Sequence, residues 1–147
     1  MHLDEILVEW AKDSELPRNK LDEVSRQTPA LHAKYLNLLT NAKLRLKRVE
    51  MQQKTLLKQK WLWYNGKMSE EEIKTLGWDF DPLNGLKIMK GDMNYYYDSD
   101  KEIQASELKV QYYKTLIDTL NEIVSSLNWR HQTVGNMIKW RQFESGG

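Results

Sequence analysis

The sequence predicts an all-α, mostly helical protein. Apolar residues recur at helical spacing over two long segments, at about residues 28–65 and 99–144. Helix start signals precede both segments, and irregular composition is concentrated between them. A chain of 147 residues with 40% hydrophobic and 29% charged residues is long enough to bury one core.

The chain is expected to begin with a short amphipathic helix over residues 2–12, because its apolar residues share one face. The stretch SELPRN ends this helix, and one or two further helical turns are expected at residues 20–26. Thr28 and Pro29 then form a start signal, in which a hydroxyl caps the helix and proline takes a position that needs no N–H donor. The long helix that follows is predicted to end at Tyr64.

This long helix is predicted to have an apolar face and a basic face. The apolar face consists of Tyr35, Leu39, Ala42, Leu46, Val49, Leu56 and Tyr64. The adjacent face carries Lys43, Lys47, Lys54, Lys58 and Trp61, together with Leu36 and a single acid, Glu50. Lys60 falls within the apolar face, where a purely structural interpretation gives a lysine no role.

Residues 69–98 are predicted to hold one brief helix and an irregular connection. Ser69 and three following glutamates form a capping box for a helix that ends near Leu76. The later Asn84-Gly85 pair allows a small hairpin. The chain thus divides into an N-terminal helical region at 1–76 with the basic helix at about 28–65, an irregular loop at 77–98, and a C-terminal helical oligomerisation region at 99–147.

The last region is predicted to form a second long helix with heptad spacing. Ser99 to Glu102 form its capping box, and Gly135 allows a kink or a split. Its apolar residues at heptad positions a, d and g make a stripe wider than a two-stranded coiled coil needs. We predict an oligomerisation surface of Ile103, Val110, Tyr113, Ile117, Leu120, Ile123, Val124, Leu127, Val134 and Ile138. Packing within one chain also explains the stripe, and the two interpretations are compatible.

Basic residues are concentrated in one part of a chain whose net charge is only +1. Residues 34–67 contain nine Lys or Arg and one acid, and the remainder is net acidic. Solvated helix faces usually mix the signs of their charges, whereas a row of cations repels itself unless a polyanion neutralises it. Lysines beside an exposed ring suit single-stranded nucleic acid, because the cations bind phosphates while the ring stacks on a base.

We therefore predict DNA contacts from Lys43, Lys47, Lys54, Lys58, Lys60, Trp61 and Lys67. The alternative is a non-enzymatic structural or adaptor protein, in which the lysines form a solvated face and their stems cover apolar surface.

Several other classes of function lack their motifs. The chain has no cysteine, which excludes disulfides and thiolate metal sites. It has no phosphate-binding G-x-x-x-x-G-K-[ST] loop, and its histidines and acids form no metal or catalytic motif. We expect no enzymatic activity, no cofactor and no metal. No apolar run approaches the roughly 18 residues of a membrane span, so no membrane partner is expected.

Two motifs resemble the UvsY family of phage recombination mediators. The run ExxQKxxLKxKxxxYNG, from Glu50 to Gly66, is similar to the family's central motif, and IKWRQFESG, from Ile138 to Gly146, is similar to the end of its C-terminal helix. The resemblance covers the chain from the basic helix to the C-terminus. Lys60 stands where the family has arginine, and Arg and Lys differ because only Arg binds phosphate through a planar fork.

The resemblance implies a closed homo-oligomeric ring that binds single-stranded DNA. It also implies that the protein helps load a RecA-like phage recombinase onto DNA coated by a single-strand-binding protein, in the cytoplasm of an infected bacterial host. The family's basic pair, which contacts DNA and a protein partner, corresponds to Lys58 and Lys60.

Overall fold

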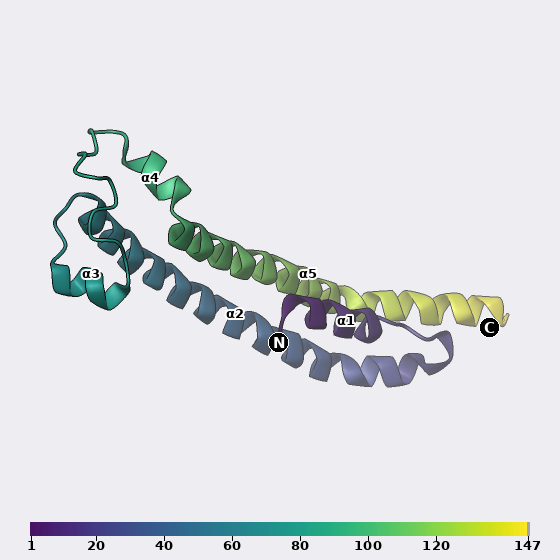
Figure 1. Cartoon of the computed structure of the whole chain (residues 1–147). Coiled ribbons are helices and arrows are strands. Elements are labelled where there is room, and N and C mark those ends of the chain that lie inside the picture. The colour runs from purple at the N-terminus through teal and green to yellow at the C-terminus, as the bar shows by residue number, and fades with distance from the viewer. Residues whose placement is uncertain (147) are drawn as a thin grey trace. The chain divides into compact units, whose positions relative to one another are not determined.

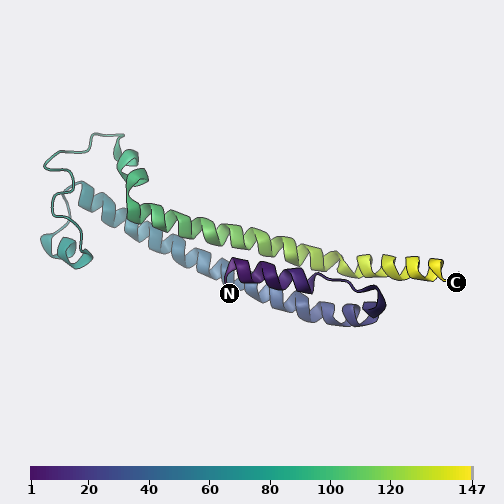
Figure 2. The same ribbon diagram turned by 45° about the vertical axis from the view of Figure 1, so that its right-hand side comes forward.

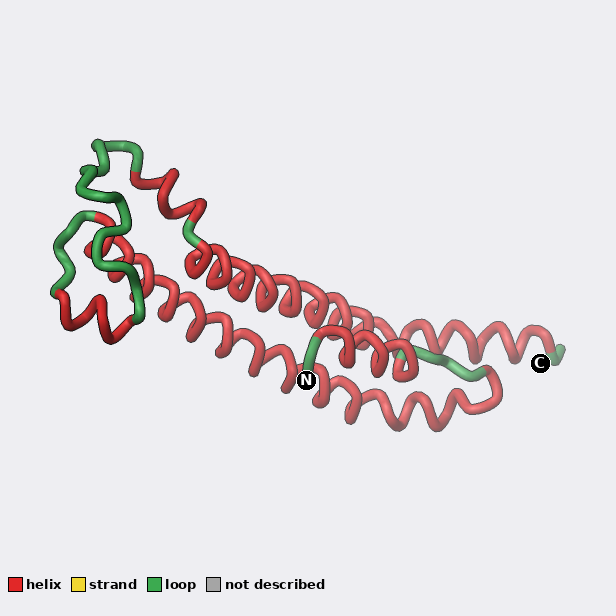
Figure 3. The backbone as a smooth tube through the Cα atoms, in the orientation of Figure 1, coloured by secondary structure: helices red, strands yellow, loops and turns green. Residues whose placement is uncertain are grey.

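A computed structural model describes residues 1–146, and these residues contain no β-strand (Figure 3). The elements are α1 (Leu3–Asp13), the 3-10 helix η1 (Arg18–Lys20), α2 (Leu21–Tyr64), α3 (Glu70–Leu76), α4 (Met93–Ser99) and α5 (Lys101–Glu144). The predicted all-α class is confirmed. Within the described part of the chain, no helix is both long enough and apolar enough to cross a membrane.

The chain folds as two compact units, and both long helices contribute to each of them. The first unit consists of Met1–Leu44 and Tyr113–Gly147, and the second of Arg45–Tyr112. The first unit therefore holds α1, the start of α2 and the end of α5. The second unit holds the end of α2, the short helices α3 and α4, and the start of α5.

In the first unit, α1 lies alongside the first part of α2 and the middle of α5, and the last turns of α5 extend beyond α1 (Figures 1 and 2). Ile6, Tyr35 and Leu120, one from each helix, are at most 1% exposed and form the centre of this packing. The Tyr35 ring meets Trp10 edge to face, with 5.4 Å between ring centroids. The predicted apolar face of the long basic helix is therefore correct here.

The start of α2 differs from the sequence prediction. The helix begins at Leu21, so Pro29 lies inside it and is not at its first turn. Proline within a helix costs about 3 kcal/mol, because it removes one backbone hydrogen bond and crowds the preceding turn. Leu21 and Val24 nevertheless pack against Val134 of α5, each at most 5% exposed. This burial extends the helix toward its N-terminus past the proline.

In the second unit, the residues after α3 fold differently from the hairpin that the sequence allowed. Asn84 and Gly85 have positive φ angles of 50° and 81°, as a tight hairpin turn requires. The turn is held by the Asp81 carboxylate, which accepts a hydrogen bond from the Gly85 N–H at 2.9 Å. No strand flanks this turn, and the chain continues into α4.

The two predicted capping boxes have different outcomes. Ser69 caps α3 as expected, because its hydroxyl accepts a hydrogen bond from the Glu72 N–H at 3.2 Å. At α5 the capping side chain is Asp100 and not Ser99, because the Asp100 carboxylate accepts from the Ile103 N–H at 3.0 Å. Gly135 does not split α5, which is continuous to Glu144.

Candidate nucleic-acid interface

The exposed face of α2 in the second unit carries the basic row that the sequence predicted. Lys47, Lys54 and Lys58 follow one another at intervals of seven and four residues, which places them on one side of the helix, and all three are exposed. Among residues 1–146, no ion pair joins any of them to a carboxylate. Their charges are therefore available to a ligand. Lys43, in the first unit, is exposed as well.

Trp61 lies one helical turn after Lys58 and remains 39% exposed. The Lys67 ammonium lies 4.7 Å from the centroid of the Trp61 ring, within the distance of a cation–π interaction. Just beyond Trp61, the Asn65 amide donates to the Trp61 carbonyl at 2.7 Å where α2 ends. An aromatic ring and a cation are thus presented together beside the lysine row.

Lys60 is buried, in contrast to the sequence prediction that it contacts DNA. Only 3% of its surface is exposed. Its ammonium lies 3.1 Å from Asp100 and 3.4 Å from Glu102, and 4.5 Å and 4.0 Å from the ring centroids of Trp63 and Trp78. Two carboxylates and two aromatic rings therefore replace the hydration of the charge. The structural role that the sequence did not suggest for Lys60 is to join α2 to the start of α5.

Asp100 is the centre of this buried cluster. Its carboxylate accepts a hydrogen bond from the Tyr64 hydroxyl at 2.6 Å and forms the ion pair with the Lys60 ammonium. The same carboxylate caps α5. Burial alone raises the pKa of Asp100, but the hydrogen bonds from Tyr64, the Ile103 N–H and Lys60 outweigh it and hold the pKa below its ordinary value. Burial and the neighbouring carboxylate raise the pKa of Tyr64. The carboxylate thus stays ionised and the phenol stays neutral near pH 7.

The predicted oligomerisation residues separate into three groups by exposure. Six are buried within their own chain: Ile103, Val110, Leu120, Ile123, Leu127 and Val134. Tyr113, Ile117 and Val124 are half-buried, and Ile138 is 38% exposed. The residues at heptad positions d and g of α5 therefore pack within the chain. From Ile117 onward, the residues at position a lie at the edge of this packing.

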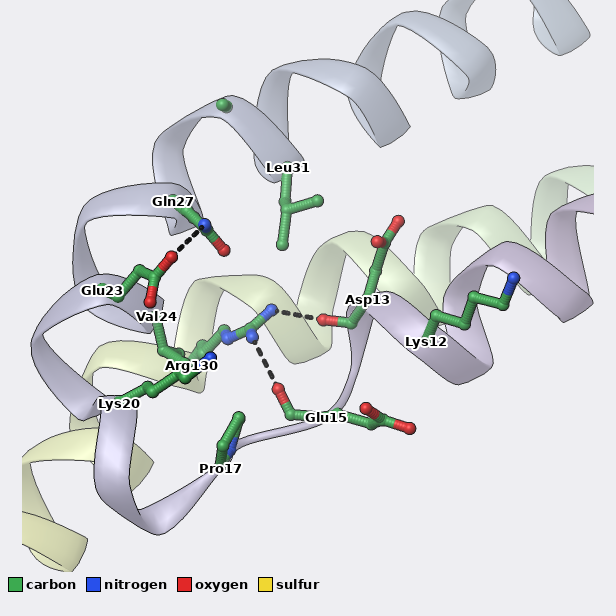
Figure 4. A pocket seen from close by; sticks show the side chains of 11 residues that line it. Lys12, Asp13, Glu15, Pro17, Lys20, Glu23, Val24, Gln27, Leu31 and Arg130 are labelled. Carbon is green, nitrogen blue, oxygen red and sulfur yellow. Dashed lines mark hydrogen bonds between the residues drawn. The ribbon is translucent and has the colours of Figure 1, made fainter.

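A partly buried polar network in the first unit was not predicted. The Asp13 carboxylate accepts hydrogen bonds from Lys34 and Tyr35, each at 2.8 Å. These bonds outweigh the effect of burial, which alone raises the pKa of Asp13, and hold it below its ordinary value. Arg130, only 7% exposed, donates to the carbonyls of Asp13 and Glu15 at 2.8 and 3.2 Å (Figure 4). Arg130 thereby caps the end of α1, which leaves carbonyls without helical partners.

Arg130 also borders a cavity of about 350 Å³ between the ends of α1 and η1 and the start of α2 (Figure 4). Basic and acidic side chains both line this cavity, so it has no charge preference of its own. Arg130 occupies heptad position g of α5, where the neighbouring g residues Leu116, Ile123 and Met137 are apolar. A basic residue at such a position is the sequence feature that could have identified Arg130.

Residues 1–146 bring together no cluster of histidines and acids that could hold a metal ion. The fold and the site together define an all-α protein whose unpaired lysines on one helix face are suited to a polyanion. The comparisons with known proteins agree with this class. A family model described as "Recombination, repair and ssDNA binding protein UvsY" matches residues 9–147, and the chain belongs to the UvsY family.

A curated relative, the recombination protein uvsY of Enterobacteria phage T4, is 24% identical over 146 residues, which are 99% of each chain. Crystal structures of the bacteriophage T4 recombination mediator protein UvsY have the same fold. The lattice type II structure gives a TM-score of 0.82 at 23% identity and covers 99% of this chain and 98% of that chain. The lattice type I structure gives 0.81 at 22% identity, with 95% and 98% covered.

Proposed function

We propose that this protein is a non-enzymatic recombination mediator that binds single-stranded DNA and helps load a RecA-like recombinase onto DNA coated by a single-strand-binding protein. The observation that carries the proposal is the exposed row of Lys47, Lys54 and Lys58 on α2, none of which forms an ion pair within residues 1–146. The family to which the chain belongs is described by recombination, repair and single-stranded DNA binding, and supports the same assignment.

Two kinds of interaction contribute to DNA affinity on this surface: charge pairing with phosphates and stacking on bases. The three lysines bind successive phosphates, and each bound phosphate releases counterions, so affinity falls as salt rises. Trp61 stacks on a base, which adds affinity without sequence preference because every base has an aromatic face. A mediator acts on strands of any sequence and therefore benefits from this combination. Lys60 contributes indirectly, by fixing the end of α2 that carries Lys58 and Trp61.

A single chain offers only a short row of lysines, and assembly into a ring multiplies it. Ile117, Val124 and Ile138 lie at the edge of the intrachain packing, where a second copy can cover them. Several basic helices in one assembly raise the effective concentration of the second and later DNA contacts. A flexible strand bound at several points is bent or wrapped. This distortion weakens the binding of a single-strand-binding protein that already coats the strand.

The experiment that tests this function measures the molar mass by light scattering, with and without oligo-dT. The proposal predicts one discrete oligomer that gains the mass of bound oligo-dT. A monomer that gains no mass contradicts it and favours an adaptor with a solvated lysine face.

The loading step is tested separately with a doubly end-labelled oligo-dT. Energy transfer between the two ends should rise when the protein binds, because the strand is compacted. Stimulation of the recombinase on coated DNA without any change in energy transfer would replace strand remodelling with recruitment alone.

A further inference from the structure

The second unit contains a cavity that the lysine row does not include. It measures about 640 Å³ and lies between the end of α2, the helix α3 and the loop that follows α3. Its lining includes Trp63, Lys67, Phe80, Leu86 and Lys87. Its volume falls within the range of about 300–1,000 Å³ that small-molecule sites occupy.

The walls of this cavity are held in place by bonds within the unit. The Trp63 indole N–H donates to the Asp79 carbonyl at 2.7 Å, and its ring lies 5.0 Å from that of Trp78. On the far side, the Asp81–Gly85 hydrogen bond fixes the turn before Leu86. The loop is therefore anchored to α2 at one end and closed on itself at the other, so the cavity exists before any ligand binds.

Exposed apolar side chains stand beside polar ones in the lining, and the lining carries no net charge. Phe80 is 61% exposed and Leu86 is 74% exposed, although both line the cavity. Lys67 and Lys87 are balanced by two acids in the lining, Glu70 and Asp81. A neutral cavity with an aromatic wall suits a planar uncharged group better than a phosphate.

Lys67 connects the cavity to the exposed face of α2. Its side chain lines the cavity, while its ammonium lies 4.7 Å from the centroid of the Trp61 ring. A strand that follows Lys54 and Lys58 to Trp61 therefore reaches Lys67 and the mouth of the cavity next.

We propose that this cavity receives an unstacked base of single-stranded DNA, with the adjoining phosphates on Lys67 and Lys87. The proposal rests on the proposed function and adds a base-binding site to it. Such a site favours single strands over duplex, because a paired base is not free to enter.

The test compares Phe80→Ala with Tyr95→Ala. Tyr95, on α4, is 73% exposed in the same unit but does not line the cavity. Phe80→Ala should weaken oligo-dT binding by about 5- to 150-fold with an unchanged salt dependence, the fold-change that corresponds to one stacked base. Tyr95→Ala should bind as the wild type does. On an abasic strand of equal length, the wild type and Phe80→Ala should bind equally.

Leu86→Glu is a second variant, and it leaves the aromatic ring of Phe80 in place. Leu86 is largely exposed, so the fold tolerates the change, and the added carboxylate should repel the strand. Circular dichroism should show wild-type helix content for each variant.

Three results would overturn the base site. The first is wild-type affinity for oligo-dT in both Phe80→Ala and Leu86→Glu. The second is an equal loss by Phe80→Ala on abasic DNA. The third is a change in the oligomeric mass of these variants without DNA, which would show that a second copy of the chain occupies the cavity. Failure of the proposed function is distinct, because the wild type would then bind neither oligo-dT nor the abasic strand.

Discussion

The ammonium of Lys60 and the carboxylate of Asp100 lie 3.1 Å apart, and their side chains are only 3% and 5% exposed. The pair joins the last turns of α2 to the first turn of α5, between residues 40 positions apart in the chain. Lys58, two residues before Lys60, points to solvent instead. Neighbouring lysines of the same motif therefore have separate roles, one in stability and one in ligand binding.

The first prediction separates these roles by single substitutions. Lys60→Ala leaves Asp100 buried without its cation and should lower the free energy of unfolding by about 3–5 kcal/mol. Lys58→Ala removes a solvated side chain and should change it by no more than about 0.5 kcal/mol. Urea unfolding followed by circular dichroism measures both.

A double variant provides the control for that comparison. Lys60→Met/Asp100→Asn replaces the ion pair with neutral groups, and Asn remains a good helix cap. It should be more stable than Lys60→Ala. Equal stability of Lys58→Ala and Lys60→Ala would show that the buried pair has no structural role.

The second prediction concerns acid. The pKa of Asp100 is held below its ordinary value of 3.8, so its interactions stabilise the fold above that pH and are lost as pH falls through the lower, folded-state pKa. The free energy of unfolding should therefore decrease from about pH 5 to about pH 2. Asp100→Asn should make this decrease smaller. Asp13, whose pKa is also lowered, should account for part of what remains. A decrease of the same size in Asp100→Asn would contradict the role of the pair.

The third prediction concerns assembly. Ile117 is half-buried at the edge of the intrachain stripe, so Ile117→Asp should disturb the fold little but place an unpaired charge in the contact between copies. The oligomer should dissociate into monomers or small species, measured by light scattering. Affinity for oligo-dT should fall with it, although no lysine has changed.

Ser125→Asp is the matched control for assembly, because it adds the same charge at an exposed position of α5. It should keep the wild-type mass and affinity. Ile117→Asp monomers that bind DNA as tightly as the wild type would separate assembly from function.

The fourth prediction concerns the exposed ring. Trp61→Ala should lose about 1–3 kcal/mol of DNA-binding free energy for each stacked base, with little change in salt dependence. Trp129, on α5, is 65% exposed and provides a control, because Trp129→Ala should not alter affinity. Fluorescence anisotropy of labelled oligo-dT measures both. Equal affinity of Trp61→Ala and the wild type would remove Trp61 from the interface.

The sequence predicted the long helices well because their apolar residues keep helical spacing over many turns. It misplaced the start of α2, since the packing of Leu21 and Val24 on Val134 involves residues more than 100 positions apart. That tertiary burial outweighs the local signal of Thr28 and Pro29. The Asn84-Gly85 pair was correctly identified as a tight turn, but no strands flank it, and the turn is closed by the Asp81 carboxylate instead.

The candidate site was predictable in part for a similar reason. The unpaired lysines of α2 are a local feature of one helix face and could be recognised from charge spacing. The role of Lys60 could not, because its partners Asp100, Glu102 and Trp78 come from other elements. Its position within the apolar face was the one local sign of burial, but the sequence-based prediction treated it as a sign of DNA contact.

The central claim is that the lysine row on α2 binds the phosphates of single-stranded DNA, and the salt dependence of binding tests it most directly. The measurement is the slope of log affinity against log salt concentration for oligo-dT, for the wild type and for Lys54→Ala/Lys58→Ala. Each phosphate contact on a single strand contributes about 0.7 to this slope, so the double variant should reduce it by about 1.4. Lys101→Ala/Lys109→Ala, which removes two exposed lysines of α5 in the same unit, should leave it unchanged. An unchanged slope in Lys54→Ala/Lys58→Ala, or an equal reduction in both double variants, would contradict the claim.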